Sequence, residues 1–531
     1  MPGSFMRQFV ARWREEILAG LSGGLLLGLS FPPYPLRILS LVALVPLLRY
    51  FLVIFPRYAG GEEALRRGFM AGFFYGIAFF GLLLFWIANL IPESAINLSW
   101  VLPPGVFLLV LYLALYPGLF GLAMAFLAGR YGKAALLAAP ALWAVTEFIR
   151  SNGEMAFSWG IVSSSLVRHP IAVQALFATG PFGFSMLVVT ANLLVCLSIW
   201  SSTTRAKAAA VSFFAASMAL ALWGGSVRMG RVDEALGSAA DSTKVAIVQP
   251  NVDLGKKWKP WYRDTVFEQI ERITHEAAAA GAELVVFPET AAPVSMSHQL
   301  EYRNWMRRIS REAGVYLYIG YIRHIKEDDR WRSFNSSGMF DPRGDLAARY
   351  DKVNLLQFGE RIPFSQYLFF LEKIDFGQAN FKRGKKQTIF ESPAGEFGSL
   401  ICFESTFADY TRKYVEKGAD FLVNVTNDGW FGSARGPLQH SETAIMRAVE
   451  NGVPVLRAAN TGVSMYIDPA GRVIERIGLN QEGMILVSLP RTGIAPTLYT
   501  RWGRMIFAGM VLLNAGIFLA AAGLMRSVRS R

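Results

Sequence analysis

The apolar residues of this chain gather in long runs, and these runs limit what it can fold into more than any other feature. They lie within residues 17–226 and 504–525, with short polar breaks between them. Apolar residues make up 53% of the chain and charged residues 18%, whereas a typical soluble domain has roughly 25% charged residues. Because about 20 mainly apolar residues cross a bilayer core as one helix, the runs predict a multi-pass α-helical membrane domain.

Eight runs are candidate transmembrane helices, although the first and the fifth are short. They cover residues 17–32, 38–55, 69–91, 104–128, 134–150, 171–200, 208–226 and 504–525. The first follows a basic N-terminus without a small-residue cleavage site after it, so we expect an uncleaved span rather than a signal peptide. The predicted domains are a membrane domain at 1–228 with transmembrane helices 1–7, a globular domain at 243–490, and a return helix with a basic tail at 491–531.

Basic residues flank alternate ends of the runs and predict their orientation. They are Arg7, Arg12, Arg14, Arg57, Arg66, Arg67, Arg130, Lys133, Arg205, Lys207, Arg526, Arg529 and Arg531, whereas loop 91–100 has neither Lys nor Arg. The positive-inside rule then places both termini in the cytoplasm. Residues 243–490 follow seven spans and are expected on the periplasmic side of a bacterial inner membrane. The net charge of +13 reflects this orientation, and no nucleic-acid partner is expected; a monomer is the default expectation.

Glu147 and Arg150 lie near the end of the fifth run, where charged groups are costly in lipid. Two interpretations are open. The first is an ion pair beside interfacial aromatic residues, and it carries more weight. The second is contact with a lipid headgroup, which makes both residues candidate substrate-binding residues.

Residues 243–490 alternate β-rich runs with helical stretches, the pattern of an α/β domain. Strands are predicted at 244–249, 283–288, 315–321, 398–403, 421–426, 453–459 and 463–468. Helices are predicted at 262–280, 299–313, 406–417 and 439–451.

Three side chains follow strands of this domain and together suggest nucleophilic catalysis. Glu289 follows an apolar strand and a proline, Lys352 follows a short strand, and Cys402 ends a buried strand. Each alone is more often structural. Together, Glu289 could take the thiol proton of Cys402, while Lys352 and the backbone N–H of Phe403 could stabilise an oxyanion.

The two cysteines of the chain are Cys196 and Cys402. Cys196 lies in an apolar run, so a disulfide between them is not expected. Cys196 is interpreted as an inert apolar residue.

The order Glu289, Lys352 and Cys402, in FPE, DK and CFE contexts, resembles the nitrilase (carbon–nitrogen hydrolase) superfamily over residues 243–490. More narrowly, the chain resembles the bacterial apolipoprotein N-acyltransferase family over nearly its whole length. That match rests on the segments 357–364, 424–440 and 447–462, and on a nitrilase-like domain inserted between the last two spans. The resemblance implies an αββα sandwich and a covalent thioester acyl-enzyme.

By this resemblance Glu289 is the general base, Lys352 the charge stabiliser and Cys402 the nucleophile. Active-site support is assigned to Glu360, Phe403 and Glu404. Trp258 and Trp430 match pocket or mobile-loop aromatics of the family, but ordinary packing is an equal alternative. His440 looks isolated, the turn 427–430 fits plain turn chemistry, and Arg457 and Asn460 are interpreted as structural. No cofactor and no metal site is predicted.

The implied reaction transfers an acyl group from a membrane glycerophospholipid, through a Cys402 thioester, to the α-amine of a diacylglyceryl-modified N-terminal cysteine of a lipoprotein. The apolar segment 355–370 follows Lys352 and is a candidate substrate gate at the membrane. Two rivals remain open at this stage. One is a membrane-tethered nitrilase or amidase that hydrolyses small amides. The other is a catalytically inactive nitrilase-like scaffold or transporter.

Overall fold

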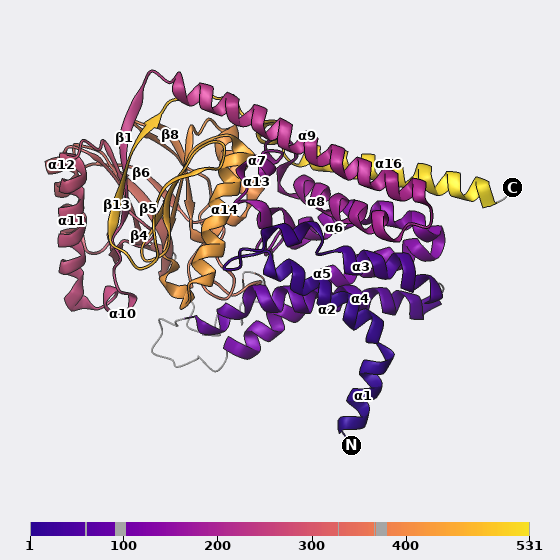
Figure 1. Ribbon diagram of the computed structural model, residues 1–531. Coiled ribbons are helices and arrows are strands. Elements are labelled where there is room, and N and C mark those ends of the chain that lie inside the picture. The colour runs from indigo at the N-terminus through magenta and orange to yellow at the C-terminus, as the bar shows by residue number, and fades with distance from the viewer. Residues whose placement is uncertain are drawn as a thin grey trace. The chain divides into compact units, whose positions relative to one another are not determined.

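The computed structural model describes residues 2–58, 61–90, 102–327, 329–365, 367 and 380–529 (Figure 1). The loop 91–100 and residues 366 and 368–370 of the predicted gate lie outside the described residues. The chain divides into two compact units, one formed by residues 1–88, 100–226 and 502–531, the other by residues 89–99 and 227–501.

In the first unit, all the secondary-structure elements of the described residues are helices, joined by turns and irregular segments. Its longer helices are α1 (Pro2–Arg12), α2 (Arg14–Leu29), α4 (Gly61–Leu84), α5 (Leu102–Tyr131), α6 (Ala139–Arg150), α8 (Leu176–Trp200), α9 (Thr204–Gly237), which continues into the second unit, and α16 (Arg504–Arg529). Shorter helical pieces are η1 (Arg37–Leu41), α3 (Val45–Arg49), η2 (Tyr50–Ile54), η3 (Phe55–Tyr58), η4 (Phe85–Asn89), η6 (Gly132–Ala138), η7 (Val162–Leu166) and α7 (Pro170–Val173).

Six helical stretches of the described chain are long and apolar enough to cross a membrane, so the predicted count of eight is not confirmed. Three of the eight runs explain the difference. The first run falls in α2, which has only 16 residues, fewer than the ~20 that a span requires. The fourth and fifth runs fall in one continuous stretch of 49 residues, Leu102–Arg150, because η6 joins α5 to α6 without a break.

Helices α4 and α5 pack with their backbones in close approach. A Cβ atom added to Gly72 would lie 1.9 Å from the carbonyl oxygen of Pro117, and one added to Gly121 would lie 2.1 Å from that of Gly68. Small residues at helix contacts are typical of membrane proteins, where close backbone packing replaces the hydrophobic effect as the force between helices.

The second unit is built around two β-sheets. The seven-stranded sheet has the order β13-β1-β2-β4-β5-β6, with β3 paired to β4, and the six-stranded sheet has the order β12-β11-β10-β9-β8-β7. The strands of the first sheet are β1 (Ser242–Gln249), β2 (Leu284–Val286), β3 (Ala292–Ser295), β4 (Tyr316–Glu327), β5 (Arg330–Phe340), β6 (Leu346–Asp351) and β13 (Gly483–Pro490). Those of the second are β7 (Ile389–Ser392), β8 (Gly395–Ile401), β9 (Phe421–Thr426), β10 (Val455–Ala459), β11 (Ser464–Ile467) and β12 (Val473–Ile477).

Successive side chains of each strand face opposite sides of its sheet, one side toward the helices and the other toward the second sheet, and this arrangement forms an αββα sandwich. In β1, Ala246 and Val248 pack in a core with helix α11 (Arg263–Ala279) and helix α12 (Leu300–Ala313), whereas Val245 and Ile247 pack in the core between the two sheets. On the outer side of the second sheet, helix α13 (Ala408–Glu416) packs on β8 and helix α14 (Arg435–Asn451) on β10. Figure 1 shows α11 and α12 along one side of the strands and α13 and α14 along the other. Short helices α10 (Leu254–Lys257), η8 (Pro260–Tyr262), η10 (Cys402–Thr406), η11 (Asp428–Phe431) and α15 (Leu498–Trp502) complete the unit.

All seven predicted strands and four predicted helices have a counterpart in the second unit. One boundary was wrong in an informative way. The predicted strand 398–403 ends at Ile401, because Cys402 has a backbone φ of +52°, which a strand cannot accommodate. The sequence did not single out β3, β5, β7, β12 and β13.

We expect Gly72→Ala to destabilise the helical unit by about 1–3 kcal/mol, the usual cost of overpacking a tight contact, because its new methyl group would overlap the backbone of Pro117. Gly81→Ala in the same helix is the matched control, since a Cβ there meets nothing within 4 Å. Thermal unfolding in detergent measures both. Equal melting temperatures for the two variants would contradict the close contact between α4 and α5.

Candidate active site

Glu289 lies in a turn directly after β2, at the C-terminal edge of the parallel strands β1, β2 and β4. The turn can approach β4 only because Gly320 has no side chain: an added Cβ would lie 2.5 Å from the backbone nitrogen of Thr290. Lys257 is 1% exposed, and its ammonium donates to the hydroxyl of Thr290 at 3.1 Å. The turn therefore holds Glu289 buried, with 6% of its surface exposed.

Lys352 follows β6 and is 1% exposed. Its ammonium lies 2.9 Å from Glu360 and 3.5 Å from Oε1 of Glu289. Burial alone would lower the pKa of Lys352, but the carboxylates of Glu360 and Glu289 outweigh burial and raise it above its ordinary value. Lys352 therefore stays positively charged although water is excluded from it.

Asn335 of β5 is a site residue that sequence reasoning missed. Its side-chain nitrogen donates to Oε1 of Glu289 at 2.7 Å and to Oε1 of Glu360 at 2.9 Å. The backbone N–H of Lys352 donates to the carbonyl of Asn335 at 2.9 Å. One amide thus aligns both carboxylates with the ammonium between them. The sequence offers no signal for it, since β5 itself was not predicted.

Cys402 begins the single turn of η10, immediately after β8. Its left-handed backbone conformation is unusual for a residue with a side chain and costs of order 1–3 kcal/mol. Burial and the carboxylate of Glu289 raise the pKa of the Cys402 thiol, and the ammonium of Lys352 opposes them. The three predicted catalytic side chains therefore influence one another electrostatically, as a shared site requires.

Glu404 links the cysteine turn to the lysine segment. One carboxylate oxygen accepts hydrogen bonds from the hydroxyl of Tyr350 at 2.6 Å and from the backbone N–H groups of Val353 and Asn354, both at 2.9 Å. The other accepts from the N–H of Ile401 at 2.9 Å. Burial raises the pKa of Glu404 to about 7 although these hydrogen bonds lower it. Its role is to hold two loops, from different sheets, in register.

A fully buried polar network lies behind Cys402 and was also missed. His440 of α14 places Nδ1 2.8 Å from Asp428 and Nε2 3.1 Å from the carbonyl oxygen of Cys402. Arg457 of β10 donates to Asp428 at 2.7 Å. The arginine and the histidine hold the pKa of Asp428 at about 2 against the effect of burial. His440 looked isolated in the sequence because its partners come from two other elements.

Of the other predicted site residues, Trp258 and Trp430 belong to the second unit, and Glu147 and Arg150 belong to the helical unit. Trp258 follows α10, and its buried ring N–H meets no acceptor within the described part of the chain. Trp430 is half-buried in η11. In the helical unit, Glu147 accepts from the ring N–H of Trp143 at 3.1 Å and from the N–H of Val162 at 2.8 Å.

Arg150 is 2% exposed and donates to the carbonyls of Phe157 at 2.8 Å, Trp159 at 2.5 Å and Gly160 at 3.2 Å. Together with Glu147 it organises the loop after α6. Contact of either residue with a lipid headgroup stays a prediction.

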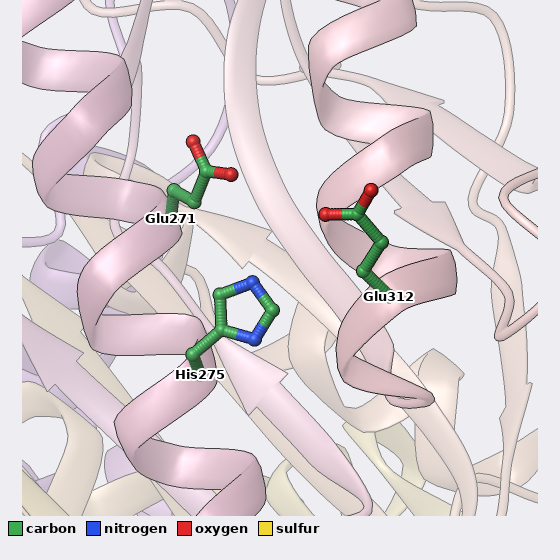
Figure 2. A group of neighbouring side chains, drawn as sticks. All are labelled: Glu271, His275 and Glu312. Carbon is green, nitrogen blue, oxygen red and sulfur yellow. The ribbon is translucent and has the colours of Figure 1, made fainter.

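Figure 2 shows three potential metal ligands, Glu271 and His275 of α11 and Glu312 of α12, which point toward one another across the two helices. Their nearest ligand atoms all lie within 4.8 Å of one another. Glu271, however, already accepts hydrogen bonds from Arg308 at 3.1 Å and from Trp305 at 2.6 Å. The guanidinium of Arg308 therefore already neutralises Glu271, and we assign no metal here.

The arrangement is suited to covalent acyl chemistry. A carboxylate and an ammonium flank a thiol, and each has fixed hydrogen-bond partners. The carboxylate can accept the thiol proton, and the ammonium is a preorganised positive charge for a developing oxyanion.

Two family models match the chain. Residues 244–499 match the carbon-nitrogen hydrolase family, and residues 23–194 match the N-terminal domain of apolipoprotein N-acyltransferase. Proteins named apolipoprotein N-acyltransferase are similar over nearly the full length. The one from Geobacter metallireducens is 32% identical and 98% of each chain is covered, and the one from Gloeobacter violaceus is 31% identical with 92% of this chain and 90% of that protein covered.

Among solved structures, an amidase from Nesterenkonia sp. AN1 is 20% identical, with a TM-score of 0.38, and the match covers 50% of this chain and 94% of that one. Nit3 of Saccharomyces cerevisiae, a nitrilase-superfamily member, is 20% identical with a TM-score of 0.37, covering 48% and 91%.

The opposite charges around Cys402 predict opposite effects on its thiol. Glu289→Gln removes a negative charge and should lower the pKa of Cys402, whereas Lys352→Met removes a positive charge and should raise it. The measurement is the pH dependence of alkylation by iodoacetamide in a Cys196→Ala background, where Cys402 is the only thiol. Shifts of the two profiles in the same direction would contradict this site.

Proposed function

This chain belongs to the apolipoprotein N-acyltransferase family, and we propose that Cys402 carries an acyl group from a membrane phospholipid to the N-terminal amine of a lipoprotein. The observation that carries the proposal is the buried ammonium of Lys352, 3.5 Å from Glu289 and 2.9 Å from Glu360. A charged amine at this position can stabilise negative charge that develops beside it during the reaction.

In the first half of the reaction, Glu289 accepts the thiol proton and the sulfur of Cys402 attacks the ester carbonyl carbon of a glycerophospholipid. The oxyanion that forms is stabilised by Lys352 and by the backbone N–H of Phe403. When the carbon–oxygen bond breaks, Glu289 returns the proton to the departing alkoxide oxygen, which leaves as the free hydroxyl of the lysophospholipid. The enzyme retains the acyl group as a thioester.

In the second half, the α-amine of a diacylglyceryl-modified cysteine attacks the thioester carbon, and Glu289 takes a proton from the amine. The carbon–sulfur bond then breaks, and the proton returns to the sulfur of Cys402. Throughout both halves Glu360 keeps Lys352 charged and in position, while Asn335 fixes the two carboxylates by donating a hydrogen bond to each. The reaction is therefore a ping-pong transfer.

The family membership disfavours the rival interpretations. A hydrolase of small amides would let water resolve the thioester, and an inactive scaffold would have no need for a buried Lys–Glu pair beside a thiol. The six apolar helices fit an enzyme whose two substrates both reside in lipid. In the predicted gate, Phe358 and Tyr367 are 54% and 69% exposed, which supports an apolar surface that meets lipid.

The thioester is the intermediate to detect. After incubation with phospholipid, intact mass spectrometry should show one added acyl chain on the parent protein and on Cys196→Ala, the matched control, but none on Cys402→Ala. Glu289→Gln should form it at least about 100-fold more slowly, since a positioned base contributes roughly 10²–10⁴. An acyl adduct on Cys402→Ala would sink the proposed nucleophile.

We also propose that the second unit faces the periplasm and that both termini are cytoplasmic, as the basic flanks predict. A reporter active only outside the cytoplasm should work when fused after residue 240 and fail when fused at residue 531. The reverse pattern would show that the number of spans before the catalytic unit is even.

A further inference from the structure

The side chain of Thr426, at the end of β9, is a buried polar group that the mechanism has not used. Strand β9 runs parallel to β8, and Ile401 pairs with Val425 at the end of the ladder. The next residues along the two strands are Cys402 and Thr426, so they lie side by side at the edge of the sheet. Thr426 is fully buried, and its hydroxyl shares a hydrogen bond with the thiol of Cys402. A hydroxyl shielded from water therefore contacts the reacting sulfur.

Before the reaction, this hydroxyl donates its proton away from the sulfur. Its oxygen lies 2.8 Å from Oδ1 of Asp428, to which it donates. A threonine hydroxyl has one proton and two lone pairs. While the proton points at Asp428, the oxygen can only accept a hydrogen bond from the thiol. In this orientation Thr426 is a partner of the protonated cysteine.

Asp428 does not depend on this hydroxyl. Arg457 donates to Oδ2 of Asp428 at 2.7 Å. Burial raises the pKa of Asp428, but Arg457 and His440 outweigh burial and hold it at about 2. Asp428 is therefore ionised, and Nδ1 of His440, 2.8 Å from its Oδ1, carries the proton of the ring. Thr426 can turn away at little cost, because rotation about its C–O bond moves a single hydrogen atom and leaves the salt bridge in place.

The thiolate of Cys402 needs such a donor. Burial raises the pKa of the thiol, and the carboxylates of Glu289 and Asp428 raise it further. The ammonium of Lys352 and the hydrogen bond with Thr426 lower it. Because the thiolate is the nucleophilic form of cysteine, a group that donates to the sulfur makes the attacking species more abundant. A hydroxyl between the sulfur and Asp428 does so on the side where that carboxylate opposes ionisation.

We propose that Thr426 is a further catalytic residue of the acyl transfer, whose hydroxyl turns from Asp428 and donates to the sulfur of Cys402 as the thiolate forms. The thiol proton passes to Glu289, and Thr426 keeps its own proton throughout. Once the sulfur carries the acyl group it has no negative charge, and the hydroxyl returns to Asp428. The proposal rests on the proposed function, because it assigns Thr426 a part in forming the thioester.

Two substitutions separate the hydroxyl from the shape of the side chain. Thr426→Val keeps the shape and removes the hydroxyl, whereas Thr426→Ser keeps the hydroxyl. At a pH below the thiol pKa, the rate of alkylation by iodoacetamide follows the fraction of thiolate. In a Cys196→Ala background we expect alkylation of Cys402 to be about 10-fold slower in Thr426→Val, since a hydrogen bond to an ionised group is worth at least about one pH unit. Single-turnover thioester formation with phospholipid should slow by a similar factor, and Thr426→Ser should recover most of both rates.

Thr274→Val is the matched control. Thr274 is a fully buried threonine of α11 whose hydroxyl donates to the carbonyl of Ile270 at 2.6 Å, so both rates should match those of the parent. Slower alkylation of Thr426→Val at an unchanged melting temperature supports the inference, and a rate equal to that of the parent overturns it.

If Thr426→Val does not fold, Thr426→Ala removes the hydroxyl without placing a methyl group beside Asp428. The same alkylation rate in Thr426→Ala and Thr426→Ser would then overturn the inference, and a slower rate in Thr426→Ala would support it. A parent protein that is alkylated at Cys402 but forms no thioester would instead refute the proposed function, since alkylation tests the hydroxyl without phospholipid.

Discussion

The ammonium of Lys352, buried between Glu289 and Glu360, is the interaction on which the catalytic unit depends. Moving a charge out of water costs several kcal/mol unless partners compensate for it, and here two carboxylates and the amide of Asn335 do so. Each partner comes from a different segment of the chain. The ion group can therefore form only when β2, β5 and the segment after β6 are assembled, which couples the chemistry of the site to the completion of the fold.

Around this centre, backbone geometry matters as much as side chains. Gly320 lets the Glu289 turn approach β4, and Cys402 adopts a left-handed conformation that ends its strand. Glu404 and Ser405 offset this strain by binding the backbone on either side of the nucleophile, at the N–H of Ile401 and at the carbonyl of Cys402. In the proposed reaction this strained turn presents both the nucleophilic thiol and a backbone N–H for the oxyanion.

The helical unit follows a different rule, because lipid offers its backbone no hydrogen bonds. Its stability comes from continuous helices and close contacts such as that of Gly72 with Pro117. Arg150, buried within this unit, is enclosed by three carbonyl groups. A family of enzymes with lipid substrates needs such a unit, since neither an acyl donor nor a lipidated acceptor leaves the membrane readily.

The sequence by itself determined the class of the protein: apolar runs of span length, period-two strands, and Glu289, Lys352 and Cys402 each at a strand end. These are local patterns, and local physics suffices to recognise them. The sequence could not fix the number of spans. Composition alone does not show that α2 is too short to span, or that residues 102–150 form one continuous helical stretch. Asn335, His440 and Asp428 were decided only by the tertiary structure. The roles of these residues depend on contacts between residues that are distant in the chain. The hydrogen-bond partner of a polar residue is settled only in the folded structure, where packing removes the water that would otherwise form that bond.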